Sequence, residues 1–177
     1  MPYVVDLYFD PEGEAAIRQI WREMAESGIC SRMLRMGGRP HISLAAYDAL
    51  DLVTFEPALR EFARQAHPVE VAFATVDSFP DGTLFLAPTI TDDLRTLFEC
   101  FHQAFQSFAA SLQGYYRPEA WHPHCSVALE LEGDALARGF ALARRAPLPI
   151  EVQLREVGLV ELHPVRALLR HTLQGLP

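Results

Sequence analysis

Apolar and polar residues follow two periods along this chain, and the pattern predicts strands and helices in turn. Apolar runs bounded by Gly, Pro and Asp predict strands over 3–9, 32–47, 69–79, 83–90, 150–162 and 166–173. Apolar positions at helical spacing predict one helix after Asp10, others over 52–67 and 92–112, and a weaker one over 133–145. Asp10 and Thr91 are the expected N-caps, and Gly28 is the expected end of the first helix.

Two segments, at 40–45 and 123–128, share a six-residue pattern, Pro-His-x-Ser-aliphatic-Ala. Side chains on an extended strand point to alternate faces. Each segment therefore places its His and Ser on one face, pairing His41 with Ser43 and His124 with Ser126. The opposite face is apolar and is expected to pack in the core, with Ile42, Leu44, Cys125 and Val127. A polar pair repeated on two otherwise apolar strands indicates a site assembled from two halves.

The second motif adds a strand after the helix over 92–112, so the predicted order is β-α-β-α-β-β-α-β-α-β-β. The motif strand follows the first helix of each half, which indicates a divergent duplication. We therefore predict an α+β fold with two lobes, in which mainly antiparallel sheets line a central cleft and helices pack outside. A length of 177 residues suits one two-lobed domain over residues 1–177.

Charge and composition narrow the possible partners. The net charge is −8 and all 15 basic residues are arginine, which argues against the basic face that grips extended duplex nucleic acid. The sequence holds neither a signal peptide nor an apolar run of about 20 residues, so we expect a cytoplasmic location and no membrane partner. Three cysteines without a CxxC spacing fit a reducing compartment better than disulfides or a structural zinc site.

Two imidazoles and two hydroxyls that face one another suit the cleavage of a phosphodiester. One imidazole can take the proton of the attacking oxygen and the other can protonate the leaving oxygen, because both titrate near neutral pH. Each role is typically worth about 10²–10⁴ in rate. The serine hydroxyls can donate to the non-bridging phosphoryl oxygens. The scheme needs no metal or other cofactor, and the pattern leaves open which of His41 and His124 is the base.

Five neighbours of the motifs are candidates for binding the substrate: Arg39, Tyr47, Tyr115, Trp121 and His122. The arginine could hold an anion, and the aromatic rings could stack on a base or pack at the rim of the cleft. The histidine allows a different interpretation, because His122 and His124 share a strand face and Glu130 follows at the same parity. Such a set is typical of cupin-like metal sites, although the predicted helices argue against a cupin barrel.

The second motif with its lead-in, Tyr-Tyr-Arg-Pro-Glu-Ala-Trp-His-Pro-His-Cys-Ser-Val-Ala over 115–128, resembles the 2H phosphoesterase superfamily, as does the strand over 157–161. Two His-x-Ser motifs half a chain apart are most similar to its 2′-5′ RNA ligase-like and RNA 2′,3′-cyclic phosphodiesterase branch. The resemblance implies that His41, Ser43, His124 and Ser126 are catalytic. It also implies a metal-independent phosphodiesterase, without a cofactor, that hydrolyses 2′,3′-cyclic phosphate or 2′-5′-linked nucleotide and RNA-end substrates, and we expect a monomer.

Two departures from the family pattern bear on the substrate. Serine stands at both motif positions where the family often has threonine, which keeps the hydroxyl donor. Members that process RNA often carry a basic residue soon after the second motif, whereas Ala-Leu-Glu-Leu-Glu at 128–132 is acidic. This favours small cyclic nucleotides or RNA ends over extended RNA. The second hypothesis is a non-catalytic module that binds nucleotides or RNA ends on the same scaffold.

Overall fold

The computed structural model describes residues 2–176, and its strands and helices follow the predicted order with one added helix. In chain order they are β1 (Tyr3–Phe9), α1 (Pro11–Glu26), α2 (Arg32–Arg35), β2 (His41–Tyr47), α3 (Leu52–Gln65), β3 (Val69–Ser78), β4 (Leu84–Pro88), α4 (Asp92–Ala104), β5 (Cys125–Ala128), α5 (Gly133–Ala143), β6 (Ile150–Glu161) and β7 (Arg166–Thr172). Short 3₁₀ helices cover Gln106–Ser111 and Gly114–Tyr116. No helix in the described part of the chain is long and apolar enough to cross a membrane.

One antiparallel sheet runs through the molecule in the order β2-β1-β6-β3-β4-β5, with β7 added on β6. The strand β6 pairs with two different strands along one edge. Its first half pairs with β3, from Ile150 to Leu154, and its second half pairs with β7, from Glu156 to Glu161. The strand β1 pairs along the other edge of β6. The expected α+β fold with a mainly antiparallel sheet is confirmed.

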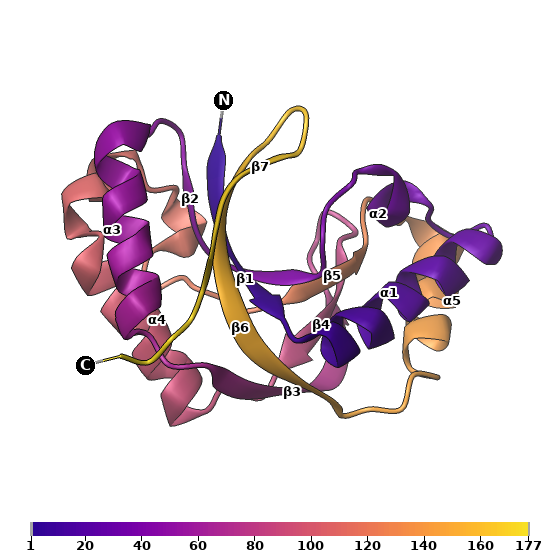
Figure 1. The fold of residues 1–177 in the computed structure, drawn as a ribbon. Coiled ribbons are helices and arrows are strands. Elements are labelled where there is room, and N and C mark those ends of the chain that lie inside the picture. The colour runs from indigo at the N-terminus through magenta and orange to yellow at the C-terminus, as the bar shows by residue number, and fades with distance from the viewer. Residues whose placement is uncertain (1, 177) are drawn as a thin grey trace.

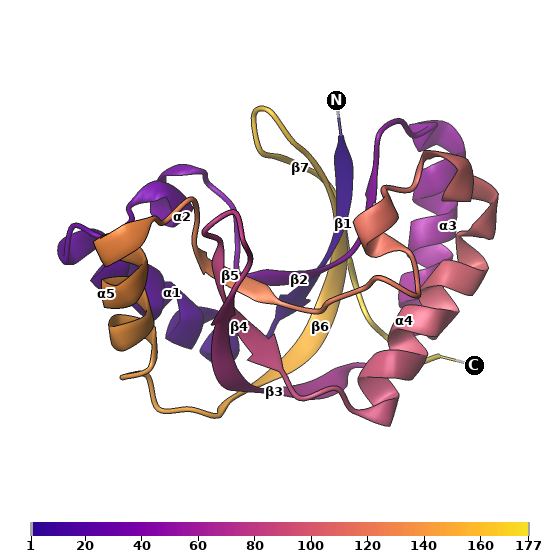
Figure 2. The same cartoon turned by 180° about the vertical axis from the view of Figure 1, so that it is seen from behind.

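Two pairs of helices lie on either side of this sheet, α3 with α4 and α1 with α5 (Figures 1 and 2). Phenylalanines fill the space between α3 and α4, with ring centroids 4.3–6.0 Å apart: Phe55, Phe62, Phe101, Phe105 and Phe108. The aromatic stripe predicted on the helix after Thr91 is therefore packing. Asp10 and Thr91 cap their helices as expected, because their side chains accept from the N–H groups of Gly13 and Leu94.

The prediction of a strand over 32–47 is wrong in its first part. Arg32–Arg35 form the short helix α2, and the chain becomes extended only at His41. Gly37 lies between them with a φ of 73°, a left-handed conformation that glycine adopts without steric cost. The Gly37-Gly38 pair therefore separates two elements, where the sequence pattern was interpreted as an interruption of one strand.

The prediction of one helix over 92–112 is also wrong at its end. The α-helix stops at Ala104, and residues 106–111 wind as a tighter 3₁₀ helix. This change of winding keeps Phe105 and Phe108 in the aromatic core. It also brings the chain beside the free edge of β2, where the carbonyl of Ser111 accepts from the N–H of Asp48 and Leu112 bridges to Tyr47. The end of the helix thus covers an outer strand of the sheet.

The helix α5 contains Gly139, which weakened its prediction from sequence. A Cβ atom at this position would lie 2.9 Å from Leu131 Cδ1 and 3.2 Å from Leu84 Cδ2. The missing side chain lets α5 lie close against β4 and the segment after β5. The glycine is explained by this close approach, and the predicted helix is confirmed.

Candidate active site

The two motif strands are the outer strands of the sheet order, β2 and β5, and they meet between the helix pairs (Figures 1 and 2). A cleft of about 240 Å³ lies where they meet, and all four motif side chains line it: His41, Ser43, His124 and Ser126. The opposite faces of the motifs are buried as predicted, with Ile42, Leu44, Cys125 and Val127 no more than 1% exposed. Burial raises the pKa of the Cys125 thiol to about 12, so this cysteine is a core residue and not a nucleophile.

Both imidazole rings are held in the same way. Nδ1 of His41 lies 2.6 Å from the carbonyl oxygen of Arg39, and Nδ1 of His124 lies 2.7 Å from that of His122. A carbonyl oxygen can only accept, so each ring carries a proton on Nδ1 and donates it. Nε2 of each neutral ring is then left with a lone pair for proton exchange in the cleft.

The surroundings of the two rings differ. His124 lies against the phenyl rings of Phe79 and Phe85, with centroids 4.8 and 5.3 Å away. Burial lowers the pKa of His124, and the neighbouring rings of His41 and His122 add to this effect, since each would repel a second positive charge. The neutral form of His124 is therefore favoured.

Asp6 on β1 is a buried carboxylate beside the first motif, and sequence reasoning missed it. The side chain is 4% exposed, and its Oδ1 accepts from the Ser43 hydroxyl at 2.7 Å. The same oxygen lies 3.8 Å from Nε2 of His41, close enough to attract a protonated ring. Tyr8 directs its hydroxyl at the other oxygen, at 3.5 Å. The available signal was one acid in the otherwise apolar run Tyr-Val-Val-Asp-Leu-Tyr-Phe.

The two serines are consequently not equivalent. A serine hydroxyl has one proton, and that of Ser43 is directed at Asp6. Within residues 2–176 the Ser126 hydroxyl has no hydrogen-bond partner, so its proton is available to a ligand. Tyr116 also lines the cleft, as Ser43 does. Burial raises the pKa of Tyr116, which keeps the phenol protonated.

Tyr115 was one of several aromatic residues near the motifs that could stack on a base, but the structure brings its neighbour to the site. Tyr115 is 85% exposed and does not line the cleft, whereas Tyr116 does. Both lie in the 3₁₀ helix Gly114–Tyr116, where strand periodicity cannot tell which side chain faces inward.

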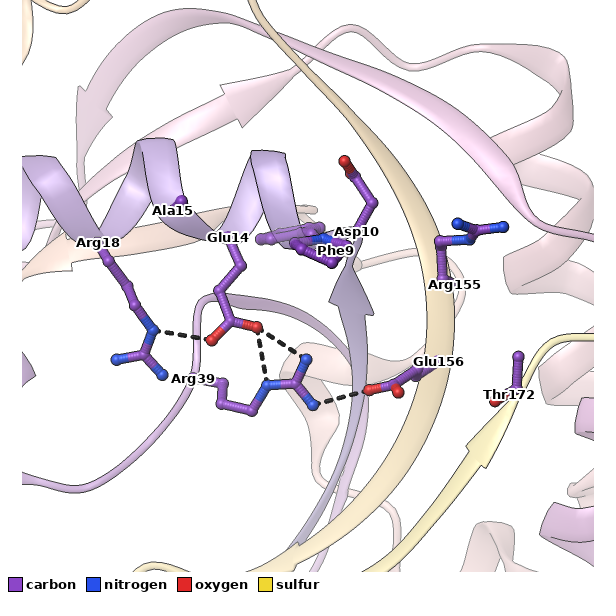
Figure 3. Close-up of a pocket in the computed structure, with 10 residues that line it drawn as sticks. Phe9, Asp10, Glu14, Ala15, Arg18, Arg39, Arg155, Glu156 and Thr172 are labelled. Carbon is purple, nitrogen blue, oxygen red and sulfur yellow. Dashed lines mark hydrogen bonds and ion pairs between the residues drawn. The ribbon is translucent and has the colours of Figure 1, made fainter.

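Arg39 lines the cleft, yet its charge is already paired. The guanidinium group donates to Glu14 on α1 and to Glu156 on β6, at 2.7–2.9 Å (Figure 3). It also lies over the ring of Tyr8, 4.5 Å from the centroid. The expected role of Arg39 in holding an anion thus competes with two carboxylates, while its backbone carbonyl orients His41.

Trp121 packs into the protein. Its ring stacks on Phe98 at 3.8 Å, and its indole N–H donates to the carbonyl oxygen of Ser43 at 3.0 Å. Trp21 on α1 makes the matching contact with the other motif, because its N–H donates to the carbonyl oxygen of Ser126 at 3.1 Å. In each motif, the backbone carbonyl of the serine therefore accepts a hydrogen bond from a tryptophan indole N–H.

The remaining two candidates also lie outside the cleft. Tyr47 is 1% exposed and its ring packs against Phe55 in the core, so it cannot stack on a nucleotide base. His122 is exposed, with its ring edge-on to Phe79 and Phe85, and it takes part in the site through its carbonyl oxygen. Of the five candidates for substrate contact, the structure brings only Arg39 into the cleft.

A family model described as the 2′-5′ RNA ligase superfamily matches residues 7–166. The chain belongs to this superfamily. The resemblance to 2H phosphoesterases, inferred from the paired motifs, is confirmed. No curated protein sequence matches the chain.

Solved structures share the superfamily's fold with this chain. TT0787 of Thermus thermophilus has a TM-score of 0.67 at 18% identity, and the match covers 99% of each chain. E. coli LigT, crystallised with 3′-AMP, has a TM-score of 0.60 at 18% identity, covering 98% of this chain and 99% of that one. A structure described as a phosphoesterase has a TM-score of 0.60 at 16% identity, covering 97% and 98%. At these identities the likeness concerns the fold.

The cupin-like interpretation has no support in this superfamily fold. It needed Glu130 beside the two histidines, but Glu130 pairs with Arg32 on α2. In the described part of the chain, no three His, Cys, Asp or Glu side chains are gathered as ligands for a metal ion. His122 and His124 share a strand face as predicted, without the carboxylate that the set required.

Proposed function

We propose that this protein is a metal-independent phosphodiesterase that hydrolyses 2′,3′-cyclic phosphate or 2′-5′-linked nucleotide and RNA-end substrates. One observation carries the proposal: His41 and His124 line one cleft, and each has Nδ1 bound to a backbone carbonyl, which leaves Nε2 to exchange a proton. General acid–base catalysis of phosphodiester cleavage needs two such groups. Related structures add support, since E. coli LigT has been crystallised with 3′-AMP, NADP⁺ and ATP.

The surroundings of the two rings suggest how the roles divide in hydrolysis. Neutral His124 would take a proton from water while the water oxygen bonds to phosphorus. Protonated His41, attracted by Asp6, would give its proton to the ribose oxygen as the bond from that oxygen to phosphorus breaks. Proton exchange with solvent then makes His124 neutral and His41 protonated again. In the reverse reaction the roles exchange.

The hydroxyl groups would hold the charge on the non-bridging oxygens. Ser126 has a proton to donate, and the protonated phenol of Tyr116 is the second available donor. Ser43 would act differently, because its proton is directed at Asp6 and its oxygen can accept. Both serines therefore belong to the proposed site, with Ser126 as a hydrogen-bond donor and Ser43 as an acceptor.

The direct test is turnover of adenosine 2′,3′-cyclic phosphate and of a 2′-5′-linked dinucleotide, followed by ³¹P NMR with and without chelator. We expect hydrolysis of at least one of them that survives the chelator and is lost in the His41→Ala, His124→Ala double variant. Persistent activity in the double variant would show that the mechanism is wrong. Binding of these nucleotides without turnover would favour the non-catalytic module instead.

A further inference from the structure

The walls of the cleft above the catalytic side chains are apolar. One wall is lined by Met33 in α2, Met36 directly after it and Leu129 after β5. The other is lined by Val160 near the end of β6 and by Leu162 and Val165 in the β6–β7 turn. In both ribbon views α2 and this turn stand on opposite sides of the gap above β5 (Figures 1 and 2). A substrate that reaches the histidines must therefore place the rest of its structure between two uncharged surfaces.

Positive charge is scarce around these walls. Among the described residues that line the cleft, Arg39 is the one arginine, and Glu14 and Glu156 neutralise it (Figure 3). Asp6 adds a negative charge at the floor, 4% exposed. A reacting phosphate can meet a protonated His41 and two hydroxyl groups, but a second phosphate would find no further arginine among the described residues that line the cleft.

The other arginines of the α2 segment do not change this balance. Arg32 pairs with Glu130, and Arg32 and Arg35 together line a separate hollow beside Gly28 and Cys30. None of the residues that line this hollow lines the catalytic cleft. Arg32 and Arg35 therefore line a hollow other than the catalytic cleft.

We propose that the cleft selects a nucleoside 2′,3′-cyclic phosphate that carries no second phosphate, in preference to the same ring on a 5′-phosphorylated nucleotide or an oligonucleotide end. The inference rests on the proposed function and narrows its substrate class. The uncharged nucleoside buries apolar surface against the walls. An additional phosphate loses water there and gains no counter-charge, which makes its binding unfavourable.

The experiment compares kcat/KM for adenosine 2′,3′-cyclic phosphate and for the same compound with a 5′-phosphate. We expect the unphosphorylated substrate to be preferred by at least about tenfold, which corresponds to ~1.4 kcal/mol. Met36→Arg adds a cation to one wall at a position that is 38% exposed. This variant should raise kcat/KM for the 5′-phosphorylated substrate several-fold, and high salt should weaken the gain.

Leu34→Arg is the matched control, because it adds the same charge on α2 at a 41% exposed position that does not line the cleft. The substrate preference of this variant should equal that of the wild type. If Met36→Arg does not fold, Val165→Arg on the opposite wall replaces it.

The outcomes separate this inference from the proposed function. Equal kcat/KM for the two substrates in the wild type, or a preference for the 5′-phosphorylated one, overturns the inference and leaves the phosphodiesterase standing. A folded Met36→Arg variant with the preference of Leu34→Arg also counts against it. Turnover of neither substrate, nor of a 2′-5′-linked dinucleotide, overturns the proposed function and this inference with it.

Discussion

His41 and His124 make the same backbone contact, each donating its Nδ1–H to the carbonyl oxygen two residues earlier, at 2.6 and 2.7 Å. The contact fixes the same tautomer in both rings. Any difference between their roles must therefore come from their surroundings. Asp6 lies beside His41, while the phenyl rings of Phe79 and Phe85 surround His124.

Removal of either ring should remove most of the activity. We expect His41→Ala and His124→Ala each to lower kcat/KM by about 10²–10⁴. The kcat/KM of the double variant should be only slightly lower than that of the less active single variant, because the two groups act as a unit. The measurement is steady-state hydrolysis of a 2′,3′-cyclic nucleotide. His67→Gln, at an exposed histidine outside the cleft, is the control and should keep full activity.

The pH dependence of kcat/KM should be bell-shaped, with its acidic limb set by the base. Because burial lowers the pKa of His124, His124 stays neutral as the pH falls through the usual histidine value of about 6.5. Activity should therefore persist below that value before it declines. An acidic limb at or above about pH 6.5, the usual histidine value, would contradict the assignment of His124 as the base.

Asp6→Asn should lower kcat/KM. The substitution keeps the shape and can still accept from Ser43, but it removes the charge 3.8 Å from Nε2 of His41. A protonated His41 then has no carboxylate beside it, so the proton transfer that we assign to this ring should slow. Steady-state kinetics and urea denaturation provide the two measurements, and an unchanged kcat/KM with lower stability would give Asp6 a structural role only.

Ser43→Ala and Ser126→Ala should affect different properties. Ser43→Ala leaves the buried Asp6 carboxylate without its 2.7 Å donor, which should lower the free energy of unfolding by about 1–3 kcal/mol. Ser126→Ala removes a hydroxyl that has no hydrogen-bond partner among the described residues. This substitution should therefore lower kcat and leave stability nearly unchanged. Urea denaturation and steady-state kinetics on both variants provide the comparison. Equal effects of the two substitutions on stability would contradict the asymmetry.

Trp121→Phe isolates one hydrogen bond behind the first motif. Phenylalanine can keep the stack on Phe98 but cannot donate to the carbonyl oxygen of Ser43. We expect the free energy of unfolding to fall by about 1 kcal/mol, measured by urea denaturation. No loss of stability would mean that water replaces the indole N–H at this carbonyl.

Period-two alternation was sufficient to place the motif side chains, because it depends only on local geometry. It put His41 and Ser43 on one face and Ile42 and Leu44 on the other, as the structure shows. The same reasoning could not find Asp6, whose importance comes from pairing between β1 and β2. It could not tell which of Tyr115 and Tyr116 faces the cleft for a similar reason, since a 3₁₀ segment has no strand period.

Packing between distant segments accounts for the other differences. Tyr47 and Trp121 stand near the motifs in sequence, but Phe55 and Phe98 hold their rings inside the protein. Arg39 precedes His41, and its partners Glu14 and Glu156 come from a helix and a strand far away in the chain. Local patterns contain no information on such partners.

The pairing of β6 with two different strands bears on how the site can move. A strand that pairs with β3 in its first half and with β7 in its second joins two parts of the sheet without a flexible connection. A hinge needs a few residues whose backbone angles can change, and the hydrogen bonds of β6 leave little freedom for that. Substrate entry would then depend on α2 and the β6–β7 turn, whose side chains line the cleft above a sheet that stays in place.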